Sequence, residues 1–181
     1  MTLCTEAEVQ RMLPLVSPQR REQALRYKHT LGQFCCLKSW LMLFDDVEMS
    51  RYQDLEWKYN EHGKPYLEGG PYFSISHCKA GIAVAIDDQP IGIDIEIIRH
   101  ANEDLIERTM NEQERVGMDD RTFTRLWTQK EAIVKAEGTG IMSFEQLQKT
   151  LMESGKWKVE SFEKDNYIYS IAYGQLCSFG A

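Results

Sequence analysis

The segment IGIDIE, residues 91–96, decides how this chain is interpreted. Successive side chains of a β-strand point to opposite faces. The isoleucines therefore share one face, which is typical of a hydrophobic core, whereas Gly92, Asp94 and Glu96 share the other. Two carboxylates on one face of an apolar strand are most often solvated surface. The alternative is that they form part of a site for a cation.

Composition restricts the class of protein. The chain has 181 residues, 43% hydrophobic and 27% charged, which suits one globular unit or two small fused lobes. The net charge of −7 argues against broad binding to nucleic acid or membranes, although basic residues cluster at Arg20, Arg21, Arg26 and Lys28. No apolar run approaches the roughly 20 residues that cross a bilayer. The first ten residues lack a secretory signal, so we predict a cytoplasmic protein.

The cysteines predict neither a zinc site nor a disulfide framework. They are odd in number, include no CxxC pair, and favour reduced thiols. They are Cys4, Cys35, Cys36, Cys78 and Cys177.

Local signals predict an α+β fold, with helices followed by strands in each of two halves. Thr5 with Glu8 forms a capping box, Ser17-Pro18 starts a second helix, and a buried helix follows. Glycines end a long helix near residue 138. The helices expected from pattern cover residues 33–46 and 120–137, and the strands cover 72–76, 81–87, 91–98, 157–163 and 167–174. The connection DDQP, residues 87–90, predicts a hairpin between the second and third strands.

The segment WTQKEAIVK, residues 127–135, carries the second group of charges. On a helix, Glu131 and Lys135 are four residues apart and lie together beside an apolar stripe. Lys130 falls inside that stripe, where a charge is costly unless it reaches a partner. A Glu–Lys pair at this spacing is most often an ion pair on a helix surface, and we read either motif alone as structural.

The two motifs together suggest a metal site. Asp94, Glu96 and Glu131 supply three hard oxygen ligands of the type that Mg²⁺ prefers, with Mn²⁺ as an alternative. Lys130 and Lys135 beside such an ion suit a polyphosphate. The acidic face of IGIDIE is therefore predicted to hold a metal that in turn holds a diphosphate.

The same residues resemble the signature of the Sfp-type 4′-phosphopantetheinyl transferases. That family has a G-[IV]-D-x-E strand followed by W-x-x-K-E-x-x-x-K on a helix, which GIDIE and WTQKEAIVK match. HGKPYLEGGPYFSISH, residues 62–77, and SPQRREQALRYKH, residues 17–29, are similar to two further family segments. The resemblance covers roughly residues 14–142.

The resemblance implies a fold and a reaction. Two similar α/β half-domains, residues 1–88 and 89–181, would form a pseudo-dimer with the active site at their interface. The enzyme would move the phosphopantetheine arm of coenzyme A to a serine of an apo acyl or peptidyl carrier protein. The reaction would release 3′,5′-adenosine bisphosphate, and a monomer would suffice.

Roles carry over residue by residue. By the resemblance, Asp94, Glu96 and Glu131 would hold Mg²⁺, and Glu131 would also accept the proton of the carrier serine. Asp94 and Lys135 complete the catalytic set, with Lys135 neutralising the α-phosphate and protonating the leaving group. Four further residues, besides Lys130, are expected to bind coenzyme A: Lys28, Lys64, Ser76 and His77.

Two departures from the family pattern bear on substrates. Cys35 stands where these enzymes commonly have an arginine for the 3′-phosphate of coenzyme A, and Lys28 or Lys38 is the candidate replacement. The distance from Asp94 to Trp127 is 127 − 94 = 33 residues. This is shorter than expected for a segment that contacts the carrier protein. Because the chain is acidic, we predict docking through a local patch that includes Met110, Arg115, Met118 and Arg121.

Two other functional classes compete with the transferase. A non-catalytic module could bind coenzyme A or a carrier protein on the same fold, but the residues needed for chemistry are all present. A metal-dependent phosphohydrolase could use the same carboxylates, and it would release its product without an acceptor protein.

Overall fold

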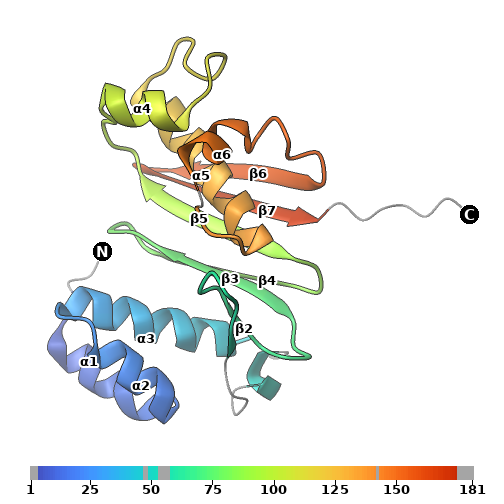
Figure 1. Ribbon diagram of the computed structural model, residues 1–181. Coiled ribbons are helices and arrows are strands. Elements are labelled where there is room, and N and C mark those ends of the chain that lie inside the picture. The colour runs from blue at the N-terminus through green and yellow to red at the C-terminus, as the bar shows by residue number, and fades with distance from the viewer. Residues whose placement is uncertain (1–3, 47–48, 53–57, 142, 175–181) are drawn as a thin grey trace, which may run out of the picture.

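Helices and strands form two parts stacked on one another (Figure 1). The computed structural model describes residues 4–46, 49–52, 58–141 and 143–174. The helices are α1 (Glu6–Met12), α2 (Pro18–Leu25), α3 (Thr30–Phe44), α4 (Glu103–Thr109), α5 (Asp120–Glu137) and α6 (Phe144–Lys149), with 3-10 turns at Leu13–Leu15 and Met49–Tyr52. The strands are β1 (Lys58–Tyr59), β2 (Pro65–Tyr66), β3 (Tyr72–His77), β4 (Ile82–Asp87), β5 (Ile91–Ile97), β6 (Trp157–Lys164) and β7 (Tyr167–Gly174).

In the N-terminal part, α3 packs against the β3–β4 hairpin, and α1 and α2 pack against α3 (Figure 1). The capping box predicted at the start of α1 is confirmed. Thr5 Oγ1 accepts from the Glu8 amide, and the Glu8 carboxylate accepts from the Thr5 amide. Ser17 likewise caps α2 ahead of Pro18. The buried helix predicted at 33–46 exists as α3, but it begins three residues earlier. Its buried face joins one hydrophobic core with the hairpin, which includes Leu37, Trp40, Leu43 and Phe73.

The hairpin predicted across residues 87–90 is wrong. β4 pairs with β3 through the turn between Cys78 and Gly81, and β5 pairs with β7 instead, with Asp94 opposite Ser170. The other edge of β5 lies beside β3 without a backbone ladder. Serine hydroxyls of β3 accept from two β5 amides, Ser74 from Ile93 N at 3.1 Å and Ser76 from Ile95 N at 3.4 Å. Polar side chains therefore satisfy donors that a neighbouring strand would otherwise satisfy.

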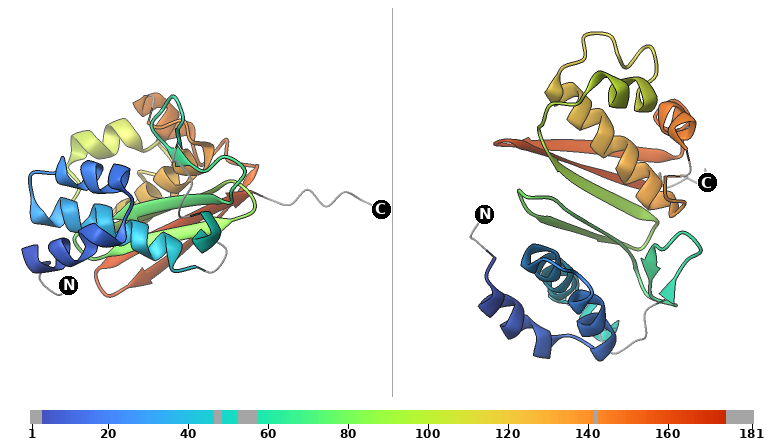
Figure 2. Two further views of the ribbon diagram at one scale, coloured as in Figure 1. Left: turned by 90° about the horizontal axis from the view of Figure 1, so that it is seen from below. Right: turned by 60° about the vertical axis from the view of Figure 1, so that its left-hand side comes forward.

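The C-terminal part is the antiparallel sheet β5-β7-β6 with α5 across one face (Figures 1 and 2). The predicted bounds of α5 are confirmed, including its end at Gly138, which adopts φ 74°. The backbone of α5 packs directly against the backbone of β5 at Gly92. A Cβ added at Gly92 would lie 1.9 Å from Ala132 O and 2.5 Å from Ala136 N. The acidic face of β5 is thus the face that meets α5.

The α+β class is confirmed, whereas the pseudo-dimer and its division at residue 88 stay predictions. Cys4, Cys35, Cys36 and Cys78 are free thiols, and Cys177 lies outside the described residues. Within the described ranges no helix has the length and apolarity needed to span a bilayer, and a cytoplasmic location stays a prediction.

Candidate active site

Two strands and one helix bring the predicted catalytic residues to one cavity. Asp94 and Glu96 come from β5, Glu131 and Lys135 from α5, and the end of β3 closes the cavity. The volume is about 340 Å³, and the remaining lining residues are Ile75, Ser76, His77 and Trp127. The alternation of β5 places its carboxylates under α5, and the four-residue spacing on α5 turns Glu131 and Lys135 toward them.

Asp94 is the most buried of the carboxylates, with 5% of its surface exposed. Its Oδ1 accepts from Lys135 Nζ at 2.6 Å and from Ser76 Oγ at 2.8 Å. Its Oδ2 is also buried but has no hydrogen-bond partner in the part of the chain that the structure describes. A buried carboxylate oxygen without a donor is costly, and a cation is the natural partner for it.

The other two carboxylates are held in an environment that opposes their charge. Burial, and then the charge of Asp94, raises the pKa of Glu131 above its usual range, and Lys135 partly offsets this. Burial and Asp94 also raise the pKa of Glu96, against the nearby cations Arg99 and Lys135. Like charges that raise one another's pKa in a small space are relieved by a divalent cation.

The donor set fits Mg²⁺ in chemistry but is not assembled at ligand distances. Among the described residues, no three His, Cys, Asp or Glu side chains stand close enough together to hold a metal ion as they are. The free Oδ2 of Asp94, beside two crowded carboxylates, supplies hard oxygens that a Mg²⁺ ion shares with water and substrate phosphates. The residues therefore fit the ion, with movement of side chains.

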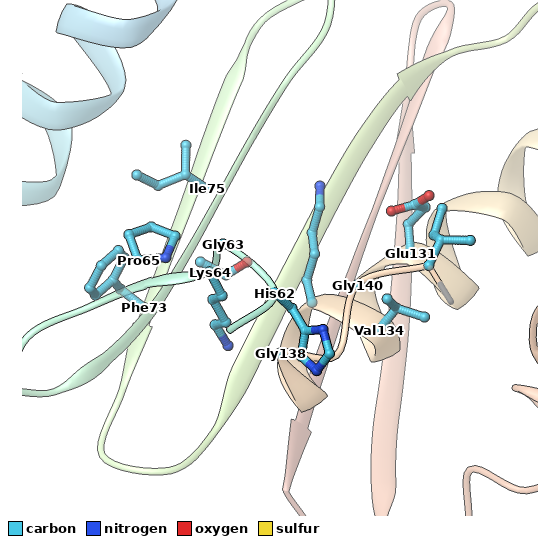
Figure 3. Close-up of a pocket in the computed structure, with 13 residues that line it drawn as sticks. His62, Gly63, Lys64, Pro65, Phe73, Ile75, Glu131, Val134, Gly138 and Gly140 are labelled. Atoms are coloured by element: carbon cyan, nitrogen blue, oxygen red, sulfur yellow. The ribbon is translucent and has the colours of Figure 1, made fainter. Parts of the chain in front are cut away.

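A second cavity of about 290 Å³ shares Ile75, Glu131 and Lys135 with the first (Figure 3). Its walls are largely apolar and include Phe73, Val134 and Ile141. Lys64 reaches into this region, with its Nζ 3.4 Å from the carbonyl oxygens of Ile91 and Ala136. Burial lowers the pKa of Lys64, which forms no ion pair with a carboxylate among the described residues.

His77 lines the acidic cavity and also two further cavities. One, of about 350 Å³, is lined by His77, Lys28 and Cys35. Burial and the charge of Lys135 lower the pKa of His77. The candidate replacement Lys28 therefore lies around the same cavity as the cysteine that departs from the family pattern. Lys38 is exposed on α3.

Arg20 is a candidate site residue that the sequence analysis missed. It lines a cavity of about 210 Å³ with His77, and only 9% of it is exposed. Its Nε and Nη2 donate to Cys36 O at 3.2 and 2.8 Å, and the guanidinium lies 4.4 Å from the centroid of the Trp40 ring. Its Nη1 donates to Gln23 Oε1 at 2.9 Å, and within the described ranges it forms no ion pair with a carboxylate. Burial lowers the pKa of this guanidinium. The only sequence signal was its place in a basic cluster.

Comparison with known proteins decides the family. The family described as the 4′-phosphopantetheinyl transferase superfamily matches residues 90–176, which contain the whole of β5 and α5. The chain is 28% identical to the 4′-phosphopantetheinyl transferase Sfp of Bacillus subtilis, over 93% of this chain and 81% of that protein. The chain belongs to the 4′-phosphopantetheinyl transferase superfamily.

Other members of the superfamily match in the same way. The transferase ffp of Bacillus subtilis is 29% identical over 86% of this chain and 75% of its own length. The transferase AcpT of Salmonella typhimurium is 38% identical over 46% of this chain and 50% of its own length. The resemblance that the sequence motifs suggested is thus confirmed.

Lys130, from the superfamily's W-x-x-K-E motif, does not lie with the other predicted site residues. Its side chain is fully buried, and its Nζ donates to Glu114 Oε2 at 2.6 Å and to Thr109 O at 2.8 Å. The predicted contact with coenzyme A is corrected on this geometry, because the ammonium group is committed to the end of α4 and the turn that follows. Lys130 ties α5 to that turn.

Replacing Lys130 with alanine is expected to lower the free energy of unfolding by about 3–5 kcal/mol, because Glu114 then remains without its cation. Urea unfolding of the full chain measures this. Lys149→Ala is the control, since Lys149 forms an exposed ion pair with Glu145 and its loss should cost about 0.5 kcal/mol or less. Equal losses in the two variants would show that the buried pair adds nothing.

The docking patch predicted from sequence is wrong for Met110, which is fully buried in a core with Phe123. Met118 packs against the same core. Arg121 forms an ion pair with Glu163. Arg115 donates a hydrogen bond within its own turn, from Nε to Asn111 O at 3.4 Å. A role of Arg115 in docking stays a prediction.

Proposed function

We propose that the protein transfers the 4′-phosphopantetheine arm of coenzyme A to a serine hydroxyl of an apo acyl or peptidyl carrier protein. The observation that carries this is the group of Asp94, Glu96, Glu131 and Lys135 around one cavity. The names of the related proteins point to the same reaction. Several adjoining cavities that share His77 or Glu131 suit a long, bent substrate with phosphates at more than one point.

Asp94, Glu96 and Glu131 are the residues that would hold Mg²⁺, or Mn²⁺ in its place. When bound, the ion would supply Lewis-acid stabilisation of charge on the pyrophosphate oxygens of coenzyme A. The buried, unpartnered Oδ2 of Asp94 supports this assignment, together with the crowding that raises the pKa of Glu96 and of Glu131.

Glu131 would act as the general base. The carrier serine is a weak nucleophile, and a positioned carboxylate that takes its proton assists the attack. The raised pKa of Glu131 favours that proton. The serine oxygen forms a bond to the β-phosphorus as the bond to the oxygen of the α-phosphate breaks. Lys135 then stabilises or protonates that oxygen, and 3′,5′-adenosine bisphosphate leaves.

Basic residues around His77 would bind the adenosine end of coenzyme A. Lys28 and Lys38 are both exposed, but only Lys28 lines the cavity that contains Cys35, which supports Lys28 as the replacement for the family's arginine. Near His77, Arg20 adds a buried guanidinium that pairs with no carboxylate in the described part of the chain, and such a group suits a phosphate oxygen. Lys64 would serve the pyrophosphate from the second cavity.

Intact-mass spectrometry of an apo acyl carrier protein tests the proposal, after incubation with this protein, coenzyme A and Mg²⁺. We expect a mass gain of one phosphopantetheine, and removal of the metal with a chelator should lower the rate at least 100-fold. Release of 3′,5′-adenosine bisphosphate should equal the carrier modified. Cleavage of coenzyme A without a carrier would point to a phosphohydrolase. Binding of coenzyme A without transfer to several carriers would point to a binding module.

A further inference from the structure

A serine hydroxyl joins the carboxylate and the ammonium group of the candidate site. We propose that Ser76 is a positioning residue, whose hydroxyl fixes Asp94 so that one carboxylate oxygen is held by the protein and the other is kept for the metal. This inference rests on the proposed function and deepens it. It gives Ser76 a role different from the coenzyme A contact expected from the sequence.

The hydrogen bonds of Ser76 use the full capacity of its hydroxyl. A serine hydroxyl has one hydrogen to donate and two lone pairs to accept with. Ser76 Oγ donates to Asp94 Oδ1 at 2.8 Å, and it accepts from Lys135 Nζ at 3.0 Å and from Ile95 N at 3.4 Å. Only 7% of Ser76 is exposed. Its orientation is therefore set by β3, β5 and α5 together.

This arrangement makes the two oxygens of Asp94 unequal. Oδ1 accepts from both Ser76 and Lys135, whereas Oδ2 is buried with no hydrogen-bond partner among the described residues. The terminal torsion of an aspartate is soft, so a free carboxylate would turn. With Oδ1 anchored, turning breaks two bonds, and Lys135 is kept on the side of Oδ1. Groups that anchor a ligating carboxylate in this way tune metal affinity.

Ser74 provides a matched comparison on the same strand. It lies two residues before Ser76, is 5% exposed, and accepts from Ile93 N at 3.1 Å. It therefore satisfies one β5 amide just as Ser76 does. No hydrogen bond joins it to Asp94 or Lys135 in the described structure. Substituting either serine removes one link between β3 and β5, but only Ser76 contacts the acidic group.

The test is Mn²⁺ binding to the full chain without coenzyme A, measured by electron paramagnetic resonance of free Mn²⁺. We expect Ser76→Ala to weaken binding about 10- to 100-fold, the usual effect of losing a group that orients a metal ligand. Ser74→Ala should keep the affinity of the unsubstituted chain within about threefold. Ser76→Thr, which restores a hydroxyl, should recover most of it. In the transfer assay, the Mg²⁺ concentration at half-maximal rate should rise for Ser76→Ala alone.

The outcomes separate the inference from the proposed function. Equal affinities in Ser76→Ala and Ser74→Ala would overturn the positioning role and leave only a structural one. If Ser76→Ala does not fold, Ser76→Thr and Ser76→Cys replace it, and equal affinity in the threonine and cysteine variants would overturn the role as well. If the unsubstituted chain binds no Mn²⁺ yet still transfers the arm, the inference fails and the transferase stands. A chain that binds Mn²⁺ with this serine dependence but transfers nothing would leave the inference standing and overturn the transferase.

Discussion

Gly92→Ala is expected to destabilise the protein by about 3–4 kcal/mol, at or above the upper end of the usual cost of overpacking. The added methyl group would lie 1.9 Å from Ala132 O and 2.5 Å from Ala136 N, and both are backbone atoms that cannot rotate away. Helix α5 must then lift from β5, which carries Glu131 and Lys135 away from Asp94. We expect loss of transfer even in the fraction of molecules that remains folded.

Chemical unfolding and a single-turnover transfer assay on the same samples check this prediction. The control is Gly155→Ala, because a methyl group there meets no atom within 4 Å and should change the free energy of unfolding by about 0.5 kcal/mol or less. Normal stability together with normal transfer in Gly92→Ala would contradict the backbone contact between α5 and β5. Normal stability with lost transfer would mean that the helix shifts without weakening the fold.

Glu131→Gln is expected to lower the rate of transfer about 100- to 10,000-fold, the range that a general base contributes. The amide keeps the size of the side chain but takes up no proton at neutral pH. The fold should tolerate the change, because burial and Asp94 already raise the pKa of Glu131 and oppose its charge. The free energy of unfolding should therefore stay the same or rise.

The measurement pairs single-turnover transfer with urea unfolding. Glu137→Gln on the same helix is the control, since Glu137 instead bonds Lys156 and Trp157. It should leave the rate unchanged. Transfer by Glu131→Gln within tenfold of the original rate would assign the base to another group, and a comparable loss in Glu137→Gln would attribute the effect to the helix.

Local patterns predicted the elements that carry the chemistry. The alternation of IGIDIE identified β5 and its acidic face, and helical spacing placed Glu131 beside Lys135. The end of α5 at Gly138 was also predicted, because the left-handed conformation that ends a helix favours glycine. Each of these features depends on neighbours within a few positions of the chain.

What the sequence did not predict depends on contacts between distant segments. Lys130 was assigned to a phosphate because its partner, Glu114, lies in a turn whose position no local pattern fixes. The predicted strand pairing was wrong for the same reason, because β5 pairs with β7, whose residues follow their partners by 70 positions (167 − 97) or more. Arg20 was missed because a basic helix residue is ordinarily solvated, and only packing against Trp40 and Cys36 reveals its burial.

The junction between β3 and β5 has a consequence for how such a site can change in evolution. Two strands in a backbone ladder can shift only by whole residues, and a shift of one residue reverses every side chain. Here two hydroxyl groups, Ser74 and Ser76, make the junction. Substitution of a single residue can therefore alter the spacing or the angle of the two parts while both strands keep their own partners. The width of the cleft between them can be adjusted gradually, without rebuilding either half.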